Sequence, residues 1–233
     1  MFEKKYFCNI LLLAVCAACL WAGDTATFVD LGFSPDGKTY AFGQYGIQAR
    51  TLRPWADFYM VDVLKNDFVS GGRISYTHDV PVTAGQDGSG ALYRLISRNA
   101  ALTDRYGINF LLQGKVLYIA VDGGESPDTG ESFEFRDFEQ GISYKASLIP
   151  STEGSGASLT SSFYISLERT DRNGSKKSHT AGNPRIKRPL IQSYHIRKVM
   201  VPPGDGSVIF VIEMRKQGDT GRDIRYMVEA LGL

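Results

Sequence analysis

Residues 31–46 read LGFSPDGKTYAFGQYG, and this stretch decides how the first part of the chain folds. Two apolar runs flank the tetrapeptide at residues 34–37. Proline presets φ for the second position of a β-turn, aspartate bonds forward to the backbone, and glycine accepts a positive φ. The stretch therefore predicts a β-hairpin. Turn chemistry also explains Asp36 better than catalysis does.

Further segments along the chain carry the strand pattern of β-branched, aromatic and alternating residues. The predicted strands are residues 28–33, 39–42, 57–63, 115–121, 133–138, 142–148, 161–167, 207–212 and 223–229. The strict alternation in 142–148 predicts an antiparallel sheet with one exposed face. The unbroken apolar run at 115–121 predicts a central strand. Residues 168–189 are polar and predict a long exposed loop or the end of a hairpin.

One segment has the spacing of a helix instead. In residues 91–106, Leu92, Leu95, Ile96 and Leu102 recur at steps of three and four. This spacing predicts one amphipathic helix lying against a sheet.

The composition is that of an ordinary globular protein. Among 233 residues, 43% are hydrophobic and 22% charged, and 26 basic residues nearly balance 25 acidic ones. A net charge of +1 gives no general field for nucleic acid, so no nucleic-acid partner is predicted. The 25 glycines and 12% aromatic residues favour a turn-rich β protein.

The N-terminus has the layout of a secretory signal. Residues 1–22 contain Lys4 and Lys5, then an apolar run that is too short to span a bilayer, then small residues. Cleavage after Ala22 would leave a mature chain that starts at Gly23 and has no transmembrane helix.

All three cysteines, Cys8, Cys16 and Cys19, lie within this segment. A chain cut after Ala22 therefore has no thiol. The alternative is lipidation of Cys19 in a membrane-anchored lipoprotein, although Cys16 stands where such signals usually have an aliphatic residue.

The end of the chain repeats the pattern of its beginning. PPGDGSVIF at 202–210 parallels the opening turn, and YMVE at 226–229 parallels YMVD at 59–62. Residues 28–63, and more weakly 197–230, resemble the repeats of TolB-type, WD-like β-propellers. The chain as a whole resembles an uncharacterised family of bacterial predicted secreted proteins. That resemblance implies export and supplies no catalytic residues.

These patterns predict a mainly β fold in a single domain, residues 23–233. We expect an antiparallel sheet or sandwich with propeller-like terminal hairpin units and one helix. The alternative is a small irregular β-propeller.

Two segments are strongly charged. Residues 122–139 hold seven acidic residues and one basic residue, and residues 169–198 hold nine basic residues and one acidic residue. Both could be solvated faces. The sharper hypotheses are a calcium site in the acidic segment and a patch for an anionic envelope polymer or lipid. The patch residues are Arg172, Lys176, Lys177, Arg185, Lys187 and Arg188.

No sequence motif assigns catalytic, cofactor-binding or metal-binding residues, and no cofactor is predicted. The leading hypothesis is an exported, non-enzymatic binding or scaffolding protein, either periplasmic or secreted. Its partner would be another envelope protein or an anionic envelope polymer. A second hypothesis is a hydrolase of envelope glycans or peptides that uses paired carboxylates. Its candidate carboxylates lie in residues 122–139 or are Asp36, Asp62, Asp205 and Glu229.

Overall fold

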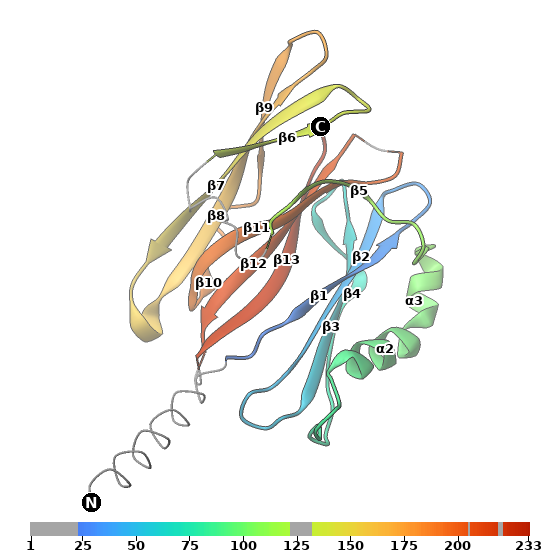
Figure 1. Ribbon diagram of the computed structural model, residues 1–233, viewed down its shortest axis with the longest axis vertical. Coiled ribbons are helices and arrows are strands. Elements are labelled where there is room, and N and C mark those ends of the chain that lie inside the picture. Colours follow the sequence, from blue (N-terminus) through green and yellow to red (C-terminus); the bar gives the residue numbers. More distant parts are fainter. Residues whose placement is uncertain (1–22, 122–131, 205, 219–220) are drawn as a thin grey trace, which may run out of the picture.

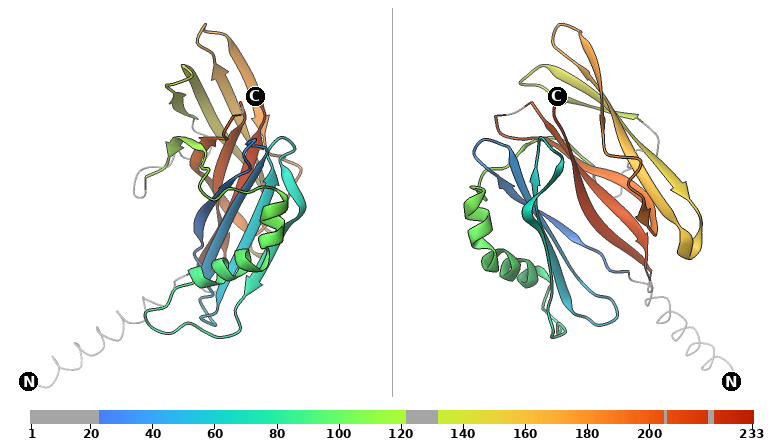
Figure 2. Two further views of the ribbon diagram at one scale, coloured as in Figure 1. Left: turned by 90° about the vertical axis from the view of Figure 1, so that its right-hand side faces the viewer. Right: turned by 180° about the vertical axis from the view of Figure 1, so that it is seen from behind.

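The computed structural model describes residues 23–121, 132–204, 206–218 and 221–233 (Figure 1). In these residues three antiparallel sheets stack face to face, and two short helices cover the outer side of the first sheet (Figure 2). We call the layers the N-terminal sheet, the central sheet and the outer sheet. The predicted mainly β, sandwich-like fold is confirmed.

The N-terminal sheet is an antiparallel meander of consecutive strands. The strands are β1 (Thr27–Phe33), β2 (Thr39–Ile47), β3 (Pro54–Asp62) and β4 (Asp67–Thr77). The predicted turn at residues 34–37 joins β1 to β2, and Gly37 has a φ of 70°. The Asp36 carboxylate accepts hydrogen bonds from the Ser34 hydroxyl (2.7 Å) and the Lys38 amide (3.2 Å). Asp36 therefore holds the turn.

The central sheet has the strand order β13-β12-β11-β5. Its strands are β5 (Lys115–Ile119), β11 (Ile191–Val201), β12 (Val208–Gln217) and β13 (Arg222–Leu231). Along β12, Val208, Phe210 and Ile212 pack toward the outer sheet. Ile209 and Val211 pack toward the N-terminal sheet. Because side chains alternate between the two faces of a strand, burial on both faces requires an unbroken apolar run, and β12 has one.

The outer sheet has the order β10-β8-β7-β6, and β9 also pairs with β8. Its strands are β6 (Ser132–Asp137), β7 (Ile142–Glu153), β8 (Thr160–Thr170), β9 (Lys176–Ala181) and β10 (Arg188–Pro189). Residues 168–189 form a hairpin end rather than a long loop, because β9 turns back onto β8 with Thr170 opposite Lys176.

The two terminal units lie face to face. Strands β1, β2 and β3 and strands β11, β12 and β13 are each three consecutive antiparallel strands, and one apolar core lies between them. Phe42 and Val61 meet Ile209 and Val211 in this core. The blades of a propeller surround a central axis, whereas these sheets are stacked. The structure therefore has the predicted sandwich and not the alternative propeller, and the propeller-like repeat does not extend to the architecture.

The predicted single helix at residues 91–106 is divided in two. Helix α2 (Ser89–Arg98) ends before Asn99, and α3 (Ala100–Arg105) follows. The Asn99 side-chain amide donates to the Leu95 carbonyl (2.7 Å), so the backbone N–H of Asn99 bonds to Ile96 instead. The apolar stripe still packs on the N-terminal sheet, as expected. Within the described residues, the helices lack the length and hydropathy that a membrane crossing requires.

Strand β5 was predicted to be central, but it is an edge strand of the central sheet in the described residues. It pairs with β11, and Leu117 and Tyr118 reach the apolar core. Val116 and Ile119 remain 42% and 59% exposed. An apolar run shows that a strand can be buried on both faces, but sheet order is set by long-range pairing that the run does not encode.

The two-sided burial of β12 predicts that Phe210→Ala, at a residue with 0% exposure, is severely destabilising. We expect the free energy of unfolding to fall by about 3–5 kcal/mol, because the change removes buried apolar surface and leaves a cavity. Urea unfolding of the mature chain, followed by circular dichroism, measures this loss. The control Phe138→Ala removes a ring that is 86% exposed, and we expect a change within about 0.5 kcal/mol. Equal losses would show that the core is not centred on β12.

Candidate functional site

A groove of about 1090 Å³ lies where the three sheets come together along β13. The N-terminal sheet contributes β3, β4 and the turn between them. The central sheet contributes β13 and the end of β12, and the outer sheet contributes β10 and the loop before it. The groove thus lies at a seam of the sandwich, where three layers supply side chains to one concave surface.

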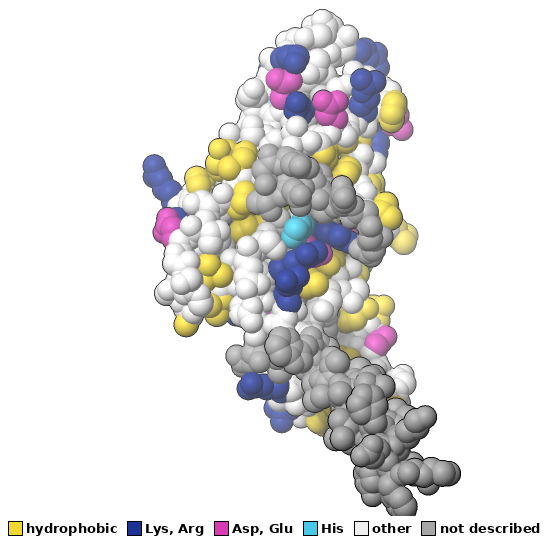
Figure 3. Space-filling view, turned by 60° about the vertical axis from the view of Figure 1, so that its left-hand side comes forward, with side chains coloured by type: hydrophobic (Ala, Val, Ile, Leu, Met, Phe, Trp, Pro, Cys, Tyr) yellow, Lys and Arg dark blue, Asp and Glu magenta, His cyan; other side chains and the backbone are white. Residues whose placement is uncertain are grey.

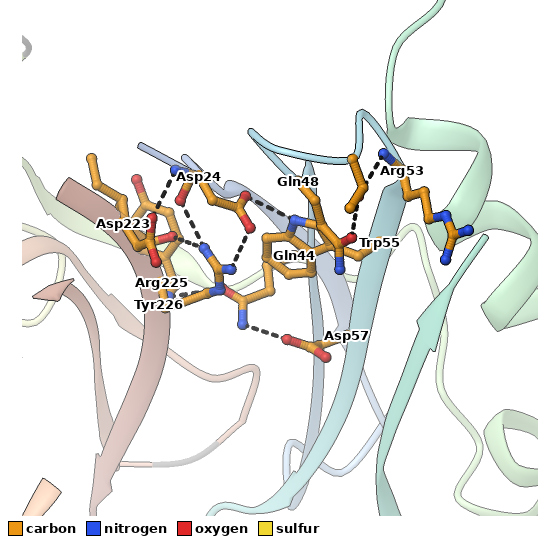
Figure 4. A network of polar contacts seen from close by, with 11 residues as sticks. Asp24, Gln44, Gln48, Arg53, Trp55, Asp57, Asp223, Arg225 and Tyr226 are labelled. Carbon is orange, nitrogen blue, oxygen red and sulfur yellow. Dashed lines mark hydrogen bonds and ion pairs between the residues drawn. The ribbon is translucent and has the colours of Figure 1, made fainter. Parts of the chain in front are cut away.

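A polar cluster, the clasp, surrounds Arg225 of the groove lining (Figure 4). The Asp24 carboxylate accepts a hydrogen bond from Trp55 Nε1 (2.8 Å) and forms an ion pair with Arg225 (2.7 Å). The Arg225 guanidinium lies 4.0 Å from the centre of the Trp55 ring, which adds a cation–π contact. The Asp24 amide donates to Asp223 (2.8 Å). The clasp therefore joins the start of the described chain to β3 and β13.

Two side-chain amides cap the edge of β13 along the groove. Gln44 accepts from the Tyr226 amide (2.8 Å) and donates to Asp57 (2.9 Å). Asn66 accepts from the Ala230 amide (2.7 Å) and donates to Glu229 (2.5 Å). These caps satisfy an edge strand that could otherwise pair with another chain.

The two caps are built in the same way. In each, a side-chain carboxamide donates to a carboxylate and accepts from a backbone amide of β13. Their backbone amides, at residues 226 and 230, are about 13 Å apart along an extended strand. The caps fix the N-terminal sheet to the central sheet at two points, and the floor of the groove lies between them.

Aromatic rings form one wall of the groove. Phe42, Tyr59 and Phe68 stack in series with centroid distances of 4.9 and 5.5 Å. The series runs outward from the core, so that Phe42 is buried and Phe68 is 43% exposed. Burial, followed by the charge of Asp57, raises the pKa of Tyr59 to about 12. Tyr59 therefore keeps its proton at physiological pH.

The lining of the groove carries more positive than negative charge. Six basic side chains face three acidic ones. They are Lys65, Arg73, Lys187, Arg188, Lys216 and Arg225, with Asp57, Asp67 and Glu229. The Arg73 guanidinium lies 5.9 Å from the centre of the Phe68 ring at the mouth of the groove. The combination of exposed ring and cation suits an anionic ligand that also has apolar surface.

Glu229 is the most deeply buried acidic side chain of the groove lining, and its residue is 5% exposed. Its carboxylate lies 3.7 Å from Arg188, which also lies 4.9 Å from the Phe163 ring centre. Burial raises the pKa of Glu229, while the hydrogen bond from Asn66 and the charge of Arg188 oppose the rise.

The structure places the predicted basic patch in two groups. Lys187 and Arg188 line the groove, and Arg185 belongs to the loop that precedes them. The other three, Arg172, Lys176 and Lys177, lie at the opposite end of β8. Arg188 pairs with Ser161 and Lys177 with Arg169, so about 26 Å of strand separates the two groups.

Two residues of the hairpin group already have partners. Arg172 donates to the carbonyl of Glu139 (3.0 Å), and Lys176 forms an ion pair with Glu168 (2.8 Å). In the groove, Lys187 pairs with Glu153 (2.5 Å). The structure thus brings the groove group, and not the hairpin group, to a concave surface.

The acidic segment is described only from residue 132 onward, and residues 122–131 lie outside the described residues. Asp137 forms an ion pair with Lys115 (2.7 Å), which also contacts Glu139 (3.0 Å). Burial alone would raise the pKa of Asp137, but the hydrogen bonds from Lys115 and from the backbone amides of Gln140 and Glu139, with the charge of Lys115, together outweigh it, and the pKa is lowered. Across the described residues no cluster of three metal-ligating side chains occurs. Cys19 and Asp205 also lie outside the described residues.

The sequence analysis did not identify Gln44, Asn66, Asp24, Trp55 or Arg225. Gln44 offers a weak signal, because a glutamine within an otherwise apolar strand needs hydrogen-bond partners when it is buried. In the structure Gln44 is 2% exposed. Asn66 has a φ of 52°, a turn conformation that asparagine tolerates.

The family model described as Predicted secreted protein (DUF2259) matches residues 41–231. This range includes every residue that lines the groove and begins after β1 and Asp24. No curated protein and no solved structure matches the chain. The chain therefore belongs to this family of predicted secreted proteins, whose function is unknown.

Proposed function

We propose that the chain is an exported binding protein whose groove holds a segment of an anionic envelope polymer. The observation that carries the proposal is the groove itself, which is lined by six basic side chains and by the partly exposed rings of Tyr59 and Phe68. The protein would act outside the cytoplasm, either in the periplasm or after release.

Each wall of the groove has a part in this proposal. Phe68 and Tyr59 offer flat apolar surface to the ligand, and Arg73 stands over Phe68. Lys187 and Lys216 approach from the outer and central sheets. An acidic polysaccharide fits this arrangement because its repeating units carry both apolar ring faces and negative charge.

Hydrolysis by paired carboxylates has less support. Glu229 has the raised pKa of a general acid, but Asn66 and Arg188 already hold its carboxylate. Asp57 is bonded to Gln44. Asp62 is paired with Lys65 (2.7 Å). We therefore assign Glu229 and Asp57 to the caps of β13, and the groove to binding.

The proposal predicts retention of the mature chain on immobilised polygalacturonate and none on neutral dextran. Retention should fall steeply with salt, because the Debye length shortens from about 30 Å at 0.01 M to about 8 Å at 0.15 M. Binding that is absent at low salt would refute the polymer proposal.

The double variant Lys187→Gln/Lys216→Gln is expected to weaken polygalacturonate binding at least about fivefold, or about 1 kcal/mol. The matched control Lys176→Gln/Lys177→Gln removes the same charge from the hairpin group, and we expect little change. Equal weakening would assign the polymer to the whole basic segment, and weakening by the control alone would assign it to the hairpin end.

Glu229→Gln tests the assignment of Glu229 to a cap. Burial raises the folded pKa above the ordinary value of 4.5, so the folded state holds this proton more tightly than the unfolded state. The stabilising contribution of Glu229 is thus complete below pH 4.5 and is lost as pH rises through the folded pKa. Glutamine keeps an oxygen for Asn66 and cannot ionise. We expect the variant to be more stable than the parent at mildly alkaline pH.

Urea unfolding over a pH series measures the effect of Glu229→Gln, and the difference in stability should vanish below pH 4.5. A variant that is less stable than the parent at alkaline pH would show that the ion pair with Arg188 outweighs burial.

Mass spectrometry of the exported chain is expected to find an unmodified N-terminus at Gly23. The clasp fixes Asp24 to Asp223, Trp55 and Arg225, so this cut leaves one residue ahead of the folded body. A lipid-modified Cys19 at the N-terminus would overturn the prediction and show that the chain is a lipoprotein.

A further inference from the structure

One residue of β13 turns its backbone toward the groove between the two caps. In an antiparallel ladder, successive residues of a strand direct their N–H and C=O alternately to one side and to the other. The pairing of β13 with β12 has no shift in register, so this alternation is unbroken. The amides of Tyr226 and Ala230 point to the caps, on the side away from β12. The N–H and C=O of Val228 therefore point to that same side.

Val228 lines the groove, and the caps bond to the residues on either side of it. Within the described residues, no protein group is bonded to the backbone N–H or C=O of Val228. The residue is only 9% exposed. A backbone donor in such surroundings needs a partner, because a buried polar group without one is costly. A ligand in the groove would supply that partner.

The caps limit this open edge to one residue. Residues that face the same side of a strand follow one another about 7 Å apart. The N–H groups next in line on both sides of Val228 are taken by Gln44 and Asn66. A peptide that adds a strand to a sheet bonds to several such residues in turn. The opening therefore suits a small group with one acceptor and one donor side by side, rather than an extended peptide.

Positive charge is not confined to the groove. Figure 3 shows Lys and Arg side chains gathered around a histidine, and no histidine is among the described residues that line the groove. Charge alone therefore does not select a ligand for the groove. Hydrogen bonds are directional, so the open backbone groups of Val228 can add the selectivity that charge lacks.

We propose that Val228 selects a sugar unit with a vicinal diol, that is, two hydroxyls on adjacent ring carbons. One hydroxyl accepts from the Val228 N–H and its neighbour donates to the Val228 C=O, because a hydroxyl can do either. The apolar face of the sugar ring would lie against Tyr59, which packs on the same core as Val228. This inference rests on the proposed polymer function and names the class of polymer, an acidic polysaccharide with free adjacent hydroxyls.

The first test compares two ligands of equal charge. Polygalacturonate has free adjacent hydroxyls on its units, whereas its O-acetylated form keeps the carboxylates and has no free diol. We expect the mature chain to bind the free form about tenfold more tightly at low salt, because acetylation removes two hydrogen bonds. Equal binding of the two forms would overturn the inference and leave the proposed polymer function standing. Binding of neither form would overturn both.

The second test removes the donor. Val228→Pro deletes an N–H that does not bond to β12, so the ladder is kept. We expect the preference for the free form to fall from about tenfold to about threefold, because one of the two hydrogen bonds is lost. If acetyl groups merely clashed with the groove, the variant would keep the full preference, and that result would overturn the inference.

The matched control is Ile119→Pro on the edge strand β5. Ala120 donates to β11, so the N–H of its neighbour Ile119 points away from the sheet, as that of Val228 does. This variant should keep the tenfold preference of the parent. An equal fall in both variants would show that proline acts through the fold and would overturn the assignment to Val228.

Nuclear magnetic resonance tests the contact without a proline and serves where Val228→Pro does not fold. In a chain labelled at valine, Val228→Ile identifies the Val228 amide signal. Oligogalacturonate should shift this signal saturably, and its acetylated form should not. An unmoved signal at saturating oligogalacturonate would overturn the inference. Poly-L-glutamate that binds more tightly than polygalacturonate and shifts the same signal would assign the edge to a peptide and would also overturn it.

Discussion

The burial of β12 on both faces is the constraint on which the architecture depends. Phe210 points toward the outer sheet and Val211 toward the N-terminal sheet, and neither is more than 1% exposed. A strand with apolar side chains on both faces must be covered from both sides, because exposing either face would cost about 1.5–3 kcal/mol per large side chain. The central sheet therefore needs a sheet on each side, which sets the order of the layers.

Stacked sheets leave their charged groups at the borders between layers, and a binding site can form there. Side chains between the layers are apolar, so polar groups collect where one sheet ends against another. One seam is the groove along β13, where Gln44 and Asn66 cap the strand edge. The same packing that hides β12 thus forms the candidate groove.

Local sequence patterns predicted the strands, the turn and the helical segment, whereas contacts between distant residues determine how these elements are joined. The turn at 34–37 and the alternation in 142–148 depend on neighbouring residues and could be predicted. The break in the helix depends on one bond from Asn99, which the apolar spacing does not report. The caps of β13 join residues 182 and 164 positions apart in sequence, which no local pattern reveals. Only Lys187 and Arg188 of the predicted basic patch line the groove. The other residues of the patch are spread along β8, away from the groove.

Two buried glutamates on the adjacent strands β12 and β13 differ in the cations that hold their carboxylates. Burial raises the pKa of Glu229, because one arginine at 3.7 Å and one amide compensate its charge only in part. Glu213 has two arginines, one of them at 2.6 Å. Arg197 and Arg215 together compensate the buried Glu213 carboxylate, because a buried charge must stay paired. The unequal partners of these two glutamates therefore separate a carboxylate whose pKa burial raises from one that two guanidiniums hold.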